Sequence, residues 1–349
     1  MSTLKRVRDC GRVPVTPGGS VALRLSSGVA GFAGLATCGS VWADPVCNAK
    51  VMARRALEIG AAVATWQAAG GSVAFVTLTM RHRRWQPLAT LWGALSYAWN
   101  RVTGGTSWKR DTAAHGVAGW MRVVEVTHGA NGWHVHVHAL LFLEPSLVGH
   151  DLDGLHRSMF GRWSSGLRAR GLARPLMVGQ DARLIDGAAD RDLARYFTKA
   201  VHGGHRVALE LTQSQTKHAR ASHGTRPVWA LLDDVVDLGD ADALDLWHEW
   251  ERSSKGRRQV TWAQGLRHRL GLLVEHSDEE IAAEEMGTAD DGLVLIDAAG
   301  WALMVQAPAL IPQLLHVAES GGLTAVRGFL HEHQITYAEL TPHTERVPA

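Results

Sequence analysis

Three histidines alternate with apolar residues in the segment 133–142, which reads WHVHVHALLF. Successive side chains of a β-strand point to opposite faces, so His134, His136 and His138 would project together from one face. Imidazoles are common ligands of divalent metal ions, and an apolar face behind the strand would hold them rigidly. The alternative is a row of polar residues on the solvent face of a half-buried strand. The regular spacing favours a metal site.

A carboxylate in the preceding strand can complete this site. The segment 119–127 reads GWMRVVEVT, and the turn 128–132 joins it to the histidine strand as an antiparallel hairpin. A loop of five or six residues puts Glu125 opposite Val135 or His136, and the second register puts its carboxylate beside the imidazoles. Two or three histidines with one carboxylate suit a Mg²⁺ or Mn²⁺ that also holds a phosphate, although Zn²⁺ suits the imidazoles too.

A second group of reactive residues lies on the segment 190–201, for which the pattern predicts a helix. Asp192, Tyr196 and Lys199 are spaced by four and three residues, so they share one strip of its surface. Lys199 would favour the phenolate form of Tyr196 and screen the charge of an attacked phosphate, and Asp192 is placed to take a proton. The alternative is a half-buried tyrosine in a surface network of polar residues.

The small number of tyrosines narrows the choice of a nucleophile. The chain has three. Tyr97 lies in a tryptophan-rich apolar segment typical of a core helix, and Tyr337 has no basic neighbour in its segment. A tyrosine nucleophile would therefore be Tyr196.

The chain also has three cysteines, Cys10, Cys38 and Cys47. Cysteines of cytoplasmic proteins are more often free or metal-bound than paired in disulfides. Together with Asp44 they would form a four-ligand set that zinc accepts, although structural zinc sites prefer cysteine or histidine. The spacing leaves free thiols and bound zinc as equal alternatives.

Charge is distributed unevenly along the chain, although the net charge is only +2. Residues 1–226 hold 28 Lys+Arg against 13 Asp+Glu, and residues 227–349 hold 8 against 21. The excess of basic residues in 1–226 favours binding to a polyanion such as a nucleic acid, because neutralising its phosphates releases counterions. The alternative is a solvated basic face. The arginines that we assign to DNA contact lie in a stretch without carboxylates: Arg81, Arg83 and Arg84.

Hydrophobic periodicity predicts the elements that position these residues. They are a helix at 48–69 capped by Asn48, a strand at 72–80, a helix from Pro87 to 104, the hairpin, a helix at 151–170 and a strand near 176–185. From residue 72 the order is β-α-β-β-α-β, followed by the tyrosine helix. This order is typical of a ferredoxin-like antiparallel sheet, an α+β fold with helices on one face and the other face free for a site.

The remaining segments bear on membrane association, cellular location and the C-terminal region. The uncharged stretch 59–80 is interrupted by Gly70-Gly71, which argues against a membrane span, and the N-terminus lacks a signal pattern, so we expect a cytoplasmic protein. The acidic C-terminal region looks mostly helical. Within it, the basic stretch 255–270 favours a surface helix over a DNA-contacting segment.

Taken in order, these motifs resemble those of HUH endonucleases. They are FVTLT at 75–79, HVH at 136–138 with His134 before it, and Tyr196 with Lys199 three residues on. The resemblance is closest to the single-tyrosine replication initiators of rolling-circle plasmids, of the actinobacterial type. The stretches 38–47 and 246–258 also look like these initiators. The likeness thus covers most of the chain, most firmly 72–205.

The resemblance implies an activity and its partners. Tyr196 would attack a phosphodiester in single-stranded or hairpin-extruded origin DNA to form a 5′-phosphotyrosine, and the freed 3′-OH would prime synthesis by host helicase, polymerase and single-strand binding protein. His136 and His138 would hold the metal, with His134 and Glu125 as further ligands. The acidic residue four before the tyrosine, often glutamate in this family, would be Asp192.

We therefore expect a sequence-specific single-stranded DNA nicking and joining enzyme that initiates rolling-circle plasmid replication, without a membrane partner. Its regions would be a basic N-terminal segment with the cysteines at 1–71, an endonuclease domain at 72–205 and an acidic accessory region at 206–349. At Asp44 the family commonly has a cysteine, which weakens the zinc prediction.

Three alternatives remain from the sequence. A non-catalytic origin-binding or copy-control protein could use the same nuclease-like fold. A relaxase or transposase is the neighbouring choice within the class, but relaxases usually place the tyrosine before the histidine strand. A small-molecule metal hydrolase would not need a basic front half.

Overall fold

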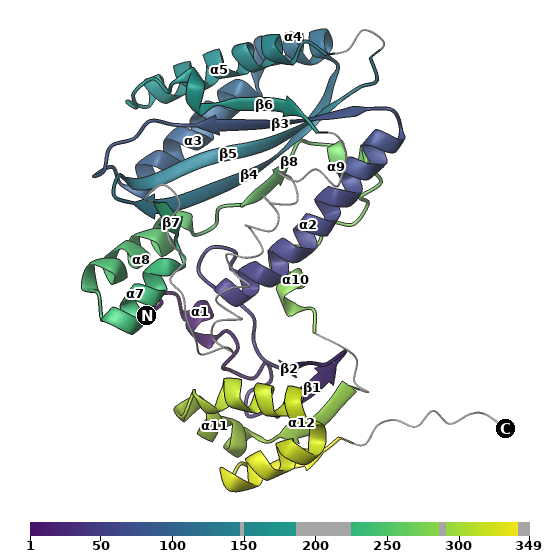
Figure 1. Cartoon of the computed structure of the whole chain (residues 1–349), viewed down its shortest axis with the longest axis vertical. Helices are drawn as coiled ribbons and strands as arrows, with labels where there is room; N and C mark the ends of the chain where they lie inside the picture. The colour runs from purple at the N-terminus through teal and green to yellow at the C-terminus, as the bar shows by residue number, and fades with distance from the viewer. Residues whose placement is uncertain (147–149, 186–224, 286–290, 341–349) are drawn as a thin grey trace, which may run out of the picture.

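The histidine strand lies inside a six-stranded antiparallel sheet with the order β6-β3-β5-β4-β7, in which β8 also pairs with β4. The computed structural model describes residues 1–146, 150–185, 225–285 and 291–340 (Figure 1). The strands of this sheet are β3 (Ser72–Thr79), β4 (Val117–Gly129), β5 (Gly132–Leu143), β6 (Asp181–Leu184), β7 (Thr225–Pro227) and β8 (Val260–Trp262). The order of its first four strands, β6-β3-β5-β4, is the ferredoxin-like one, and the α+β prediction is confirmed.

The β4–β5 hairpin sets the register of the site. Gly129 pairs with Gly132, so the turn has only two residues, Ala130 and Asn131, and the prediction of a five- or six-residue loop was wrong. The tight turn still produces the second of the two predicted registers, in which Glu125 lies opposite His136.

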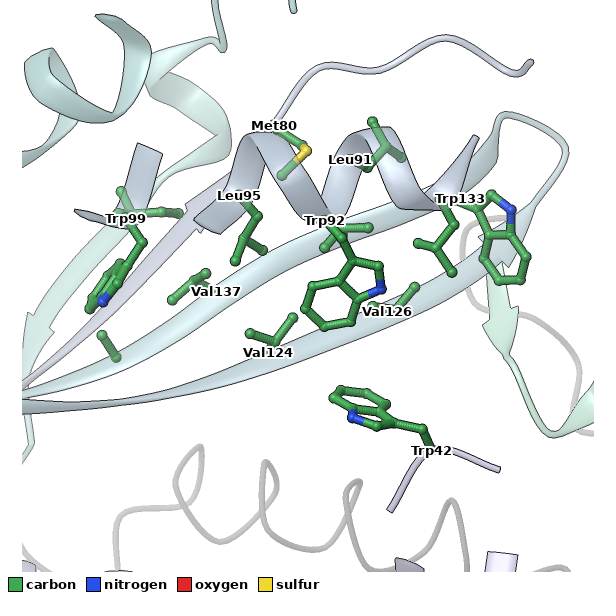
Figure 2. Close-up of a cluster of buried hydrophobic side chains, with 14 of the residues drawn as sticks. Trp42, Met80, Leu91, Trp92, Leu95, Trp99, Val124, Val126, Trp133 and Val137 are labelled. Carbon is green, nitrogen blue, oxygen red and sulfur yellow. The ribbon is translucent and has the colours of Figure 1, made fainter. Parts of the chain in front are cut away.

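One face of the sheet packs against two helices, α3 (Leu88–Val102) and α5 (Leu152–Ala169). The apolar residues that alternate with the histidines, Val135 and Val137, are fully buried there. Figure 2 shows Trp92 and Leu95 of α3 directed at the sheet residues Val124 and Val137. A short helix that the sequence analysis missed, α4 (Gly105–His115), follows α3.

The other face, which carries the histidines, is covered in part by α2 (Pro45–Ala68). Ile59, Val63 and Trp66 of this helix pack on sheet residues that include Phe142, together with the short helix α9 (Leu266–Arg269). Among the described residues, the face predicted to be free is therefore left uncovered only towards the end that carries the histidines, which are half-buried.

A second, four-stranded sheet joins the two ends of the chain (Figure 1). It contains β1 (Val21–Ser26), β2 (Val29–Ala33), β9 (Gly292–Ile296) and β10 (Tyr337–Glu339), and it packs on α11 (Ala298–Gln306) and α12 (Leu310–Glu332). Regions 1–71 and 206–349 thus share one sheet and one apolar core. Among the described residues no single helix could cross a membrane, and the bent pair α11–α12 passes only by length and composition.

The rest of the C-terminal region supports the main sheet. Its helices are α7 (Ala230–Leu238), α8 (Ala241–Ser254) and α10 (Asp278–Ala283), and α1 (Lys5–Asp9) lies at the N-terminus. The segment 255–270 does not form the predicted surface helix. Its β-branched residues Val260 and Thr261 pair with β4 instead, and only 266–269 is helical.

Candidate metal centre and nucleic-acid surface

Two histidines and one glutamate converge at the open end of the sheet. The Nε2 atoms of His136 and His138 lie 2.9 Å and 3.1 Å from the same carboxylate oxygen, Oε2 of Glu125. The three side chains come from neighbouring strands in the register described above, and their ligand atoms lie within 4.8 Å of one another. They form a three-ligand group of the kind that holds a divalent cation.

The β3 strand orients one of these imidazoles. Thr77 lies opposite His138, and its Oγ1 is 3.0 Å from Nδ1 of that ring. Phe75 stacks on the same imidazole at a centroid distance of 5.3 Å. Because the hydrogen bond to Thr77 engages Nδ1, Nε2 of His138 is the atom that faces the site. Hydrogen bonds of this kind commonly orient the histidines that bind metals.

Electrostatics keeps the carboxylate ionised. Burial raises the pKa of Glu125, but the hydrogen bonds and charges of His136 and His138 outweigh burial and hold this pKa well below 4.5. The carboxylate is therefore a charged ligand at neutral pH. The donor set of two imidazole nitrogens and one carboxylate oxygen fits a divalent metal ion.

His134 lies beside this group but makes a different contact. Its Nδ1 is 3.1 Å from Nε2 of His82, and its ring centroid is 5.2 Å from that of His136. Burial, with the neighbouring imidazoles His136 and His82, lowers the pKa of His134 to about 4, so the ring is neutral at physiological pH. The three-ligand group forms without His134.

His82, which was not predicted as a site residue, lies in the irregular segment between β3 and α3. Its only signal was its position within the arginine run RHRR at 81–84. Neither strand nor helix periodicity applies there, so its approach to the histidine strand depends on tertiary packing.

The three arginines assigned to DNA contact, Arg81, Arg83 and Arg84, are all exposed beside His82. Trp85 follows them with 74% of its surface exposed, and the guanidinium of Arg83 lies 5.6 Å from the centre of its ring. The basic segment is therefore adjacent to the group formed by Glu125, His136 and His138.

The predicted nucleophile and its helpers, Tyr196, Lys199 and Asp192, lie outside the described residues. The other two tyrosines are placed. Tyr97 belongs to α3, which packs on the face opposite the histidines, and Tyr337 belongs to β10 in the second sheet.

The cysteines form a separate cluster with Asp44. The Sγ atoms of Cys10 and Cys38 lie 3.5 Å and 3.7 Å from that of Cys47, and Sγ of Cys38 is 3.3 Å from Oδ2 of Asp44. Two ligands of a tetrahedral zinc ion are about 3.8 Å apart when each Zn–S bond is about 2.3 Å. The sulfur separations are close to that spacing.

Backbone geometry supports the cluster. The amide of Cys38 donates to Sγ of Cys10 over 3.3 Å, and the amide of Ser40 donates to Sγ of Cys38 over 3.4 Å. Gly39 between them has φ +59°, and a Cβ there would lie 2.7 Å from the backbone of Glu279. Hydrogen bonds from Cys10 and Cys38 lower the pKa of the Cys47 thiol, which favours the thiolate, the form that binds metal.

Asp44 has two roles in this arrangement. Its Oδ1 accepts hydrogen bonds from the amides of Val46 and Cys47 at 2.9 Å and 3.0 Å and so caps α2, while Oδ2 faces the thiols. The helix therefore begins three residues before the predicted start, and Asn48 does not cap it.

Comparison with known proteins places the chain in a family. A family model described as "Replication protein" matches residues 35–153, which include Glu125 and the histidine strand. "Protein rep" of Streptomyces lividans is 30% identical over 317 residues, covering 73% of this chain and 68% of that protein. A "Neomycin resistance protein" of Streptomyces cyanogenus is 32% identical over 161 residues, covering 39% and 36%. No solved structure matches. The chain belongs to the Rep family of plasmid replication initiators.

Proposed function

We propose that this protein nicks and rejoins one DNA strand at a plasmid origin, using Tyr196 as nucleophile and a Mg²⁺ or Mn²⁺ ion held by Glu125, His136 and His138. The observation that carries the proposal is the convergence of both Nε2 atoms on one carboxylate oxygen, at 2.9 Å and 3.1 Å. This group lies next to an exposed basic segment that suits phosphate binding.

Each side chain of the proposed metal site has a distinct role. Glu125 supplies the charged ligand, and Thr77 fixes the ring of His138 so that its Nε2 faces the site. His134, neutral and next to His136, is available as a further ligand or as support for that ring. A bound Mg²⁺ or Mn²⁺ polarises the scissile phosphodiester and stabilises the charge that develops on it.

The proposed reaction is a phosphoryl transfer to the chain. The phenolate oxygen of Tyr196 forms a bond to phosphorus, the bond from phosphorus to the 3′ oxygen breaks, and that oxygen leaves as a 3′-OH after taking up a proton. Lys199 would favour the phenolate, and Asp192 would accept the phenolic proton or that of a later water. The placement of Tyr97 and Tyr337 away from the histidines supports Tyr196 as the nucleophile.

The substrate would be the single-stranded or hairpin-extruded form of the origin. The 3′-OH would then be extended by the host polymerase, with a helicase and single-strand binding protein. Rejoining reverses the same transfer, with a new 3′-OH attacking the phosphotyrosine.

A cleavage assay tests the proposal. Single-stranded fragments tiling the DNA around the gene, each labelled at the 3′ end, are incubated with Mn²⁺ or with EDTA. We expect a metal-dependent labelled product covalently linked to the protein, absent in Tyr196→Phe and retained in the matched control Tyr97→Phe. DNA binding without an adduct on any fragment would instead identify a non-catalytic origin-binding protein.

We also infer that Cys10, Cys38, Asp44 and Cys47 hold a structural zinc ion, which would tie the N-terminal segment to α2. Sulfur separations of 3.5 Å and 3.7 Å and the two N–H···S hydrogen bonds support it. Metal analysis of the purified protein should find one zinc per chain, lost in Cys38→Ser. Three thiols that titrate freely in the native protein, without zinc, would contradict the inference.

A further inference from the structure

The segment between β3 and α3 presents an aromatic surface. Trp85 has 74% of its surface exposed, although tryptophan is usually mostly buried. The guanidinium of Arg83 lies 5.6 Å from the centre of its ring, and Arg84 is also exposed. An indole ring among cations is the combination that proteins use to bind single-stranded nucleic acid, because the ring stacks on a base and the cations contact phosphates.

Two contacts fix this segment against the metal-binding strand. Nε2 of His82 and Nδ1 of His134 are joined by a hydrogen bond of 3.1 Å. At the hairpin, Gly132 lies so close to Arg84 that a Cβ on the glycine would be 2.3 Å from the Arg84 carbonyl oxygen. The position of Trp85 is therefore coupled to that of the histidines.

The segment also has an internal turn. The amide of Arg83 donates to Oε1 of Gln86 over 2.7 Å, and the amide of Gln86 donates to the Arg83 carbonyl over 3.0 Å. Because this turn is closed, the backbone that carries the indole is already ordered and loses little conformational freedom when DNA binds.

We propose that Trp85 is a stacking platform for an unpaired base of the DNA strand beside the scissile phosphate, with Arg83 and Arg84 contacting the flanking phosphates. The proposal rests on the proposed function, because it takes single-stranded DNA as the substrate. A base inside a duplex is already stacked on its neighbours, so the platform selects the unpaired form of the origin.

The chain contains a matched control. Tyr97 is also partly exposed, and Arg170 lies 5.6 Å from the centre of its ring. This pair repeats the cation–aromatic arrangement between Tyr97 of α3 and Arg170 at the end of α5, and both helices pack on the face opposite the histidines. Replacing Tyr97 by alanine therefore tests whether any exposed aromatic residue with a basic neighbour contributes to DNA binding.

The test compares two labelled probes in EDTA, an oligothymidylate and an abasic strand of the same length. For Trp85→Ala we expect binding of oligothymidylate to weaken by about 5- to 150-fold, the range found for base–aromatic stacking, with little change for the abasic strand. Trp85→Phe should recover much of the loss, and Tyr97→Ala should bind both probes like the parent protein.

Equal losses on both probes would show that Trp85 acts only through the shape or charge of the loop, and an unchanged affinity would show that it does not contact DNA. Either result overturns the proposal. Binding is measured in EDTA and does not depend on strand cleavage, so failure of the nicking proposal in the cleavage assay leaves this test intact. As a second measurement, irradiation with a 5-iodouracil-substituted strand should crosslink the peptide that contains Trp85.

Discussion

Replacing Gly132 by alanine tests the packing of the arginine-rich segment 81–84 on the β4–β5 hairpin. Gly132 has φ +81°, and a Cβ there would lie 2.3 Å from the carbonyl oxygen of Arg84. An L-residue in the left-handed region costs about 1–2 kcal/mol. Relieving the overlap requires the Arg84 backbone to move by about 1 Å, and such overpacking costs about 1–3 kcal/mol. We expect Gly132→Ala to lower the free energy of unfolding by about 2–5 kcal/mol.

Gly28 provides the control for backbone strain alone. It lies in the β1–β2 hairpin with φ +80°, and a Cβ added there would meet no atom within 4 Å. Gly28→Ala should therefore cost only about 1–2 kcal/mol. Urea unfolding of both variants measures the difference, and Gly132→Ala should also weaken binding of single-stranded DNA. Equal stability losses, with DNA binding unchanged, would refute the close packing of Arg84 on the hairpin.

Three further predictions concern charged and buried groups. Glu125→Gln should weaken Mn²⁺ binding by more than about ten-fold, measured by calorimetry, because a neutral amide replaces the only charged ligand of the three-residue group; unchanged affinity would exclude Glu125 as a ligand. Burial in α5 lowers the pKa of His156 below 6.5, because the folded protein disfavours the charged ring. The neutral ring therefore contributes stability above pH 6.5, and this contribution is lost as the pH falls through the lowered pKa. His156→Leu should therefore lose less stability than the parent protein between neutral pH and pH 5, by thermal unfolding. Asp44→Cys should hold zinc more tightly than the parent protein in competition with a chelator, since thiolate is the preferred ligand; weaker retention would indicate that capping of α2 matters more than ligation.

Local spacing determined the chemistry of the histidine strand. The alternation of His134, His136 and His138 with apolar residues fixes their common face, because strand side chains alternate whatever the rest of the chain does. The preceding strand limited Glu125 to two registers. The tight Ala130-Asn131 turn, which decides between them, was not recognised from its residues.

The tertiary structure decided which residues meet across long sequence separations. His82 reaches His134 from an irregular segment, and Asp44 rather than Asn48 caps α2 beside the thiols. Val260–Trp262 joins the main sheet as β8 instead of continuing a helix. Periodicity reports only which side of an element is apolar. The partner of that side depends on the packing of the whole chain, because burial is favourable against any complementary apolar surface.

The ends of the chain show the same limit. β1 and β9 are separated by more than two hundred residues, and the residue pattern of neither strand identifies the other as its partner. Their pairing follows from shared burial of Val21, Leu23, Val294 and Ile296, all of which are fully buried in one core. The sequence by itself thus determined the chemistry-bearing motifs and the α+β class, which depend on neighbours a few residues apart. Only the folded chain determined how the two ends close a second sheet, because non-local pairing is selected by packing rather than by local preference.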